Sequence, residues 1–376
     1  MSGDQQGQRA VWADNSKFLA IFLVFFGHIL ESFYDHGRDD MLLPIKFCHS
    51  FFIPIFFILV GIFAKPKVAT LKETVFRLFP RRIIPVIFFT VLLLPIHFIL
   101  PSDTQIIKEN PLHIVVLYLM GAPVLNWTTW FLVTLFTAEI IFQQLTNRVK
   151  NTAGLIILSL MIYSLGWIIS AKSHVLIYLL SGFWFIREAF VAVFFILIGY
   201  LIRDYLFKLM QQRLAIISSA CLLCLAVTLI TFDLNSFINK HVLDSRDTVV
   251  MSVSQHGDFF LFPVTALSGS LFIMLLSCLI PSNRLMNYFG KNTLVLLGMA
   301  GFFLHFINAR LLDFFPTDLN SILLVLLALG LTLVQIIICW PMIAGLNRFT
   351  PTLIGQWPKS ISKSKPKPLD EKRRAQ

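Results

Sequence analysis

Ten long apolar segments constrain this chain more than any other feature of its sequence. Each is close to the roughly 20 residues that an α-helix needs to cross a bilayer. The composition agrees, because 57% of residues are hydrophobic and 14% are charged, whereas soluble domains carry about 25% charged residues. The sequence therefore predicts an all-α, polytopic integral membrane protein with about ten transmembrane helices, at 16–34, 42–64, 81–100, 127–146, 153–170, 186–202, 213–232, 259–280, 293–312 and 320–346.

The placement of Lys and Arg predicts the orientation of these helices. If the N-terminus lies in the cytoplasm, the cytoplasmic segments hold 23 of the 31 Lys and Arg residues, which follows the positive-inside rule. We therefore expect both termini inside, with a cytoplasmic segment at 1–15, a transmembrane domain at 16–347 and a basic, disordered tail at 348–376. The net charge of +11 is then a topology signal that faces membrane lipids, and no nucleic-acid partner is expected.

Two shorter apolar segments and the cysteines need separate readings. Residues 111–122 and 173–185 are too short to span, and we expect re-entrant or interfacial pieces there. All five cysteines lie in or beside apolar segments, so free thiols are expected. The C-x-x-C at Cys221 and Cys224 has no polar neighbours, which favours core packing over a redox or zinc site. We expect no metal.

Polar residues in the first helix are the strongest functional candidates, because ionisable groups inside a membrane are costly and usually functional. Lys17 and His28 are 11 residues apart, about 16 Å along one helix face, and Asp14 precedes them. An imidazole suits proton transfer from a hydroxyl near neutral pH. The alternative is a buried histidine bonded to a carbonyl group. The aligned Lys17, and the small Gly27 beside His28, favour function.

Other candidates each have a structural alternative. Arg81 and Arg82 are suited to bind phosphates, but could be positive-inside anchors. Trp130 could belong to an interfacial aromatic belt, whereas Glu139 in the same helix needs a partner. His305 is either a second polar wall of a cavity or a satisfied core histidine. No glycine-rich phosphate loop, H-E-x-x-H or G-x-S-x-G motif is present.

In this order, the residues resemble the acyltransferase type 3 family, particularly its fucose 4-O-acetylase-like branch. The first-helix pattern of an acid, a base and a later His is matched by Asp14, Lys17 and His28, with Lys where Arg is commoner. The second predicted helix departs from the family's motif at Phe52 and Val60, where His and Ser are common. The motif matches elsewhere are Phe51, Pro54, Phe56, Phe57 and Gly61, Arg81 and Arg82, Trp130, Phe131 and Leu132, and Gly290, Lys291, Asn292 and His305.

The resemblance, which covers residues 11–345, implies a membrane O-acetyltransferase of the bacterial cytoplasmic (inner) membrane. It would move acetyl from cytoplasmic acetyl-CoA to a sugar hydroxyl of a surface or lipid-linked glycan. His28, Asp14 and Lys17 would be catalytic, with His28 as general base or covalent acetyl carrier. Arg81, Arg82 and Lys17 would bind coenzyme A, and Trp130, Glu139 and His305 the acceptor.

Two other classes of membrane protein stay open at this point. Sparse polar residues in ten helices also suit a transporter or flippase for a small solute or a lipid-linked glycan, although such proteins often contain internal repeats, and none is found here. A glycan polymerase usually has a large outer loop, whereas the longest predicted outer loops here have about 25 residues by the spans above.

Overall fold

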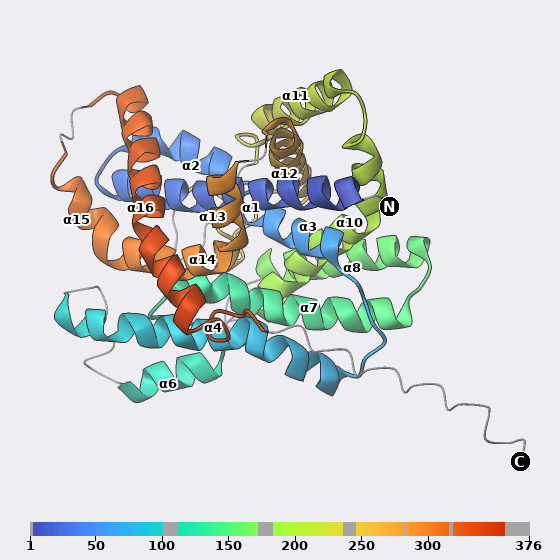
Figure 1. The fold of residues 1–376 in the computed structure, drawn as a ribbon, viewed down its shortest axis with the longest axis horizontal. Helices are drawn as coiled ribbons and strands as arrows, with labels where there is room; N and C mark the ends of the chain where they lie inside the picture. The colour runs from blue at the N-terminus through green and yellow to red at the C-terminus, as the bar shows by residue number, and fades with distance from the viewer. Residues whose placement is uncertain are drawn as a thin grey trace, which may run out of the picture.

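The computed structural model describes residues 3–100, 111–171, 183–235, 246–281, 283–315 and 319–357. Within these ranges the secondary structure is helical, apart from an isolated antiparallel bridge between Val250 and Gln255. The helices pack side by side in one bundle around α1, which crosses the middle of the molecule (Figure 1). Their bounds are α1 Gly3–Asp35, α2 Leu42–His49, α3 Pro54–Phe63, α4 Leu71–Ile99, α6 Pro111–Leu119, α7 Trp130–Arg148, α8 Thr152–Ala171, α10 Ile186–Leu209, α11 Leu214–Thr231, α12 Leu261–Leu279, α13 Arg284–Lys291, α14 Thr293–Phe302, α15 Asn308–Leu312 and α16 Ser321–Phe349.

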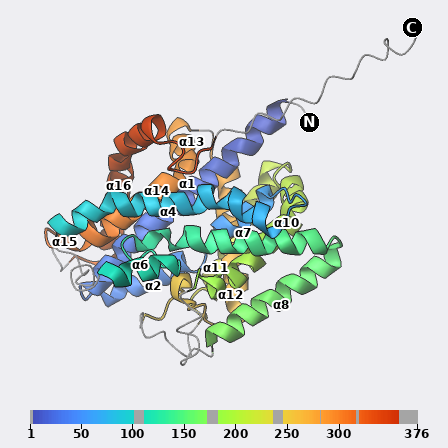
Figure 2. The same ribbon diagram turned by 90° about the horizontal axis from the view of Figure 1, so that it is seen from below.

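The predicted all-α, polytopic membrane architecture is confirmed. Among the described residues, nine helices are long and apolar enough to cross a membrane. They correspond to nine of the ten predicted spans. The other predicted span, 127–146, is the 19-residue helix α7, which falls short because Glu139, Gln143 and Gln144 lower its hydropathy. Its contacts with α4 and α10 place it inside the bundle, beside the spanning helices (Figure 2).

Helix α1 extends further than the sequence indicated. It begins at Gly3 rather than near residue 16, so it includes most of the segment assigned to a cytoplasmic arm. Near this end α1 packs against α13, where a Cβ at Gly290 would overlap the carbonyl oxygen of Asp14. The tail from residue 358 onward lies outside the described residues.

Helices α3 and α10 cross unusually closely because each contributes a glycine. A Cβ at Gly61 would overlap the carbonyl oxygen of Ile196, and a Cβ at Gly199 would overlap that of Ile58. Small residues permit this approach between membrane helices, where van der Waals packing replaces the hydrophobic effect as the main source of association. The second predicted span is thereby fixed against the sixth.

Two predicted spans are interrupted where the sequence suggested continuous helices. The second is split into α2 and α3 by a turn at residues 50–53, because Pro54 has no backbone N–H to continue the helical hydrogen bonds. The ninth contains a π-helical segment, Phe303–Ile307, between α14 and α15. π-helical segments of this kind often occur at functional sites.

The ambiguous segment 111–122 contains the nine-residue helix α6, too short to span a bilayer. Most of segment 173–185 lies outside the described residues. Its last three residues form a turn in which Trp184 and Phe185 have φ of 53° and 50°. The five cysteines are free, as predicted.

Candidate functional site

Four stretches of non-helical or distorted backbone meet around one cavity of about 370 Å³. They are the turn at 50–53, the 3-10 turn Trp127–Thr129, the π-helical segment Phe303–Ile307 and the loop at 246–257. Each contributes to the lining, beside the C-terminal half of α1. Irregular backbone at membrane depth is tolerated where it is buried in protein or lines a cavity, since its polar groups find no partner in lipid. The cavity is therefore the candidate active site.

His28 lines this cavity and is held by a carboxylate on its own helix. Its Nδ1 lies 2.6 Å from Oε2 of Glu31, three residues further along α1. Both side chains are largely buried, with exposed fractions of 19% for His28 and 11% for Glu31. A carboxylate bonded to one ring nitrogen fixes the tautomer and leaves the other nitrogen, Nε2, able to accept a proton. The pair has the geometry of an oriented general base.

Glu31 also gathers two groups from elsewhere in the chain. Nε2 of His49 lies 3.5 Å, and Nη1 of Arg246 lies 3.2 Å, from its Oε1 atom. His49 reaches α1 over Gly27, where a Cβ would lie only 3.2 Å from the imidazole Nε2. The glycine beside His28 thus provides space for His49, and the turn after His49 presents that imidazole to the cavity.

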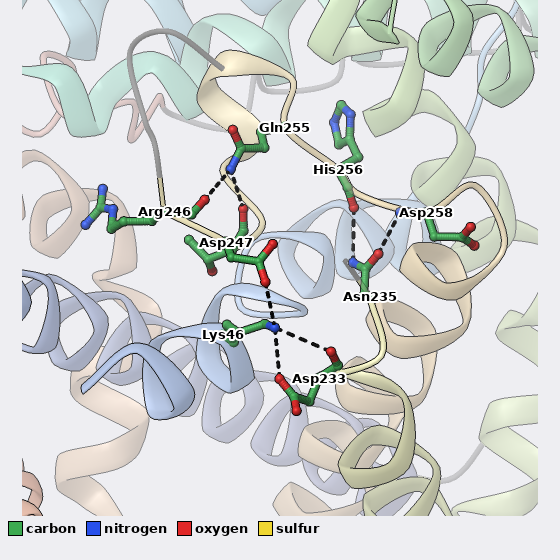
Figure 3. Close-up of polar contacts among 9 residues, drawn as sticks. Lys46, Asp233, Asn235, Arg246, Asp247, Gln255, His256 and Asp258 are labelled. Carbon is green, nitrogen blue, oxygen red and sulfur yellow. Dashed lines mark hydrogen bonds and ion pairs between the residues drawn. The ribbon is translucent and has the colours of Figure 1, made fainter. Parts of the chain in front are cut away.

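The loop that carries Arg246 is fixed by a network of polar contacts (Figure 3). Lys46 of α2, 8% exposed, bonds Asp233 and Asp247 at 2.8 and 3.2 Å. The Gln255 side chain donates to the Arg246 and Thr248 carbonyls, both at 2.8 Å. The Arg246 guanidinium points away from Lys46 in this view, and the loop's backbone is held so that Arg246 reaches Glu31.

A second buried pair supports the same loop. Glu188, fully buried at the start of α10, accepts hydrogen bonds from Arg187 and from the hydroxyl of Ser254 at 2.6 Å. Ser254 has φ of 58°, which costs a non-glycine residue about 1–2 kcal/mol, and the buried bond to Glu188 holds it there. Beside it, burial and the Arg187 charge lower the pKa of His256 to about 3, so its imidazole is neutral.

The structure brings Trp130 to the cavity with His28, and places His305 just behind the wall. Trp130 lines the cavity together with Trp127, and its ring packs against Phe185 at 5.8 Å between centroids. His305 lies in the π-helical segment, where its Nε2 accepts a hydrogen bond from the Trp127 N–H at 3.3 Å. Its observed contact therefore positions a cavity wall.

Asp14 and Lys17 lie on α1 well away from His28. Nζ of Lys17 is 3.3 Å from Oδ1 of Asp14, and the two side chains are 35% and 11% exposed. Neither lines the cavity. Along a straight helix Lys17 stands about 16 Å from His28, so direct contact with the same reacting atoms is excluded in this geometry.

Arg81, Arg82 and Glu139 lie outside the cavity lining as well. Arg82 of α4 makes a two-pronged ion pair with Glu139 of α7, with N–O distances of 2.7 and 3.1 Å. Arg82 is therefore the partner that the Glu139 carboxylate was expected to need, and the ion pair links α4 to α7. Arg81 is exposed.

Glu31, His49 and Arg246 were not among the site residues predicted from the sequence. The signal for Glu31 was present in the sequence, because residues three apart share a helix face. Arg246 comes from a loop some 200 residues away. Nothing local in the sequence connects it with α1.

Comparison with known proteins supports the sequence resemblance. The model of an acyltransferase domain, that of the acyltransferase type 3 family, matches residues 10–342, most of the chain. No curated protein and no solved structure matches. The match includes α1 from residue 10 onward, with His28 and Glu31, and every segment that lines the cavity. With its membrane-spanning helices and this match, the chain belongs to the acyltransferase type 3 family of integral membrane acyltransferases.

Proposed function

We propose that this acyltransferase moves an acetyl group from acetyl-coenzyme A to a sugar hydroxyl of a cell-surface or lipid-linked glycan, in a bacterial cytoplasmic membrane. The observation that carries the proposal is the His28–Glu31 pair in a cavity lined by two tryptophans. The family assignment favours an enzyme over a transporter or flippase. An aromatic face such as Trp130 suits the apolar face of a sugar ring, and Trp127 lines the same cavity.

As a general base, Nε2 of His28 takes the proton of the acceptor hydroxyl while that oxygen forms a bond to the acetyl carbonyl carbon. The carbon–sulfur bond breaks, and the coenzyme A thiolate leaves and then takes a proton. Glu31 holds Nδ1 and stabilises the imidazolium that forms. Arg246 and His49 share the carboxylate and hold it in place.

A covalent route uses the same geometry. Nε2 of His28 attacks the acetyl carbon and the thiolate leaves. The hydroxyl then attacks the acetyl-imidazole, the carbon–nitrogen bond breaks to release Nε2, and the hydroxyl proton passes to the coenzyme A thiolate. Either route requires the thioester to reach His28, which lies about three turns further along α1 than Lys17. The separation between Lys17 and His28 favours an extended coenzyme A, with its phosphates near Lys17 and Arg81 and its pantetheine arm reaching toward His28.

Direct transfer tests the donor and the acceptor together. Purified protein in lipid nanodiscs is incubated with labelled acetyl-coenzyme A, or with longer acyl-coenzyme A donors, and with glycan extracted from the cell surface and from membranes. We expect acetyl esters on the glycan and release of the free thiol in equal amounts. Transfer of a longer acyl group, or of acetyl to a non-carbohydrate acceptor, would contradict the proposal.

Coenzyme A binding tests the basic residues separately. Arg81→Ala should weaken acetyl-coenzyme A binding by about 10- to 150-fold, because a hydrogen bond to a charged group contributes about 1.5–3 kcal/mol. Arg148→Ala, which removes another exposed arginine, is the matched control. Arg82 can bind a phosphate only by giving up Glu139. Unchanged affinity in Arg81→Ala would indicate that Arg81 acts only as a positive-inside anchor.

A further inference from the structure

A second hollow of about 620 Å³ lies between α4, α6 and the segment that leads into α7. This volume falls within the roughly 300–1,000 Å³ of small-molecule sites. Its lining is apolar, with residues such as Ile83, Val86 and Leu94 on α4 and Val115 on α6. Among the described residues that line it, only Thr90 and Tyr118 carry a hydroxyl, and these two bond each other at 2.9 Å. We call this hollow the α4–α6 groove.

The α4–α6 groove borders the outside of the bundle. Helix α6 runs along the outer side of α4 (Figure 1) and is too short to fill the space beside it. Several lining side chains are strongly exposed, among them Ile87 at 48%, Val115 at 54% and Leu119 at 70%. Since α4 is one of the membrane-spanning helices, this opening faces hydrocarbon. No charged residue lies among the described residues that line the groove.

One thin wall separates the α4–α6 groove from the cavity that holds His28. Leu125 lines the groove, whereas Trp127, two residues later, lines the cavity. On α7, Val133 lines the groove, whereas Trp130, three residues earlier, lines the cavity. The wall is fixed by His97, whose Nε2 bonds the Leu125 carbonyl at 2.9 Å.

The turn just before α10 also lies between the groove and the cavity, at Trp184 and Phe185. The Trp184 indole lines the groove, and the next residue, Phe185, packs against the rings of Trp127 and Trp130 at 6.0 and 5.8 Å. A molecule with an apolar chain in the groove would therefore have its polar end one aromatic layer from the cavity. The charge-free lining excludes a phosphate or a sugar from the groove itself.

We infer that the α4–α6 groove holds the hydrocarbon chain of a lipid-linked acceptor, and so orients its sugar toward the His28 cavity. The inference rests on the proposed function, because it requires an acceptor at that cavity. It adds that the acceptor is recognised in two places: its chain by α4 and α6, its sugar by the tryptophan-lined cavity.

Photo-crosslinking tests the chain site without requiring turnover. A polyprenyl-phosphate sugar with a diazirine in its chain is added to the protein in phosphatidylcholine nanodiscs, and labelled peptides are mapped. We expect labels on α4 and α6, displaced by unlabelled polyprenyl-phosphate sugar and unchanged by a higher proportion of phospholipid. Equal displacement by phospholipid would assign the groove to bulk lipid and overturn the inference.

Filling the groove tests its part in catalysis. Ile87→Trp with Val115→Trp places indoles in the groove from half-exposed positions, whereas Val91→Trp with Leu112→Trp places them on the same two helices outside its lining. With the lipid-linked acceptor, the filled variant should raise KM about tenfold, equivalent to 1.4 kcal/mol. The control pair and a water-soluble glycan acceptor should show unchanged KM.

The outcomes separate the two levels of the account. An equal loss with lipid-linked and soluble acceptors would show that the groove residues only support the fold, and no loss with either would show that the groove is not used. Both results overturn the inference and leave the proposed function standing. If wild-type protein acetylates no glycan while the lipid probe still labels α4 and α6, the proposed function fails and the chain-binding site survives.

Discussion

Glu31→Gln is the sharpest perturbation of the site, because it removes a charge while keeping the side chain's size. The carboxylate lies 2.6 Å from Nδ1 of His28, a charge-assisted bond that contributes about 1.5–3 kcal/mol. If this bond is needed only when His28 becomes cationic in the transition state, kcat should fall by about 10- to 150-fold. The new amide can also donate to Nδ1, which selects the tautomer whose Nε2 cannot accept a proton.

The assay is the initial rate of acetyl transfer in nanodiscs, with donor and acceptor varied separately. We expect the loss in kcat with little change in donor KM, a division that simple damage to the fold would not give. Glu73→Gln is the matched control, since Glu73 is an exposed residue of the α4 capping box and Gln can serve there too. A kcat within twofold of wild type would refute the role given to Glu31.

Three further predictions concern packing and charge. Gly199→Leu should prevent stable folding, because its side chain would overlap the Ile58 carbonyl; normal yield and melting temperature would contradict this. The pKa of His256 is about 3 in the folded chain and about 6.5 unfolded, so the unfolded state binds the extra proton between these values. Stability should therefore fall below pH 6.5, by about 2 kcal/mol at pH 5, and His256→Gln should flatten this part of the melting profile; an unchanged profile would argue against it. Arg82→Ala should lower the melting temperature more than Arg82→Ala with Glu139→Ala, since the single change leaves a carboxylate without its ion pair; the reverse order would disprove the pairing.

The spans were predictable because bilayer crossing imposes a length and a composition that any sequence must satisfy. The interruptions were harder to foresee. Pro54 did mark the turn after α2, yet the apolar run on both sides favoured one helix. The π-helical segment around His305 has no comparable local signal, because it depends on packing against Trp127 and its neighbours.

The site was partly predictable for a similar reason. His28 stood out as an ionisable residue inside an apolar helix, and Trp130 through its resemblance to a family motif. Arg246 reaches Glu31 only because Lys46, Gln255 and Ser254 hold its loop. Such long-range contacts are set by the tertiary fold, so no spacing in the sequence reveals them.

The most direct test of the central claim is the acetyl transfer rate of His28→Ala at wild-type abundance. Both chemical routes need Nε2 of His28, so we predict that transfer to the glycan is abolished while acetyl-coenzyme A still binds. Retained affinity for the donor, measured on the same sample, shows that the variant is folded. Acetyl transfer at the wild-type rate by folded His28→Ala would contradict the account.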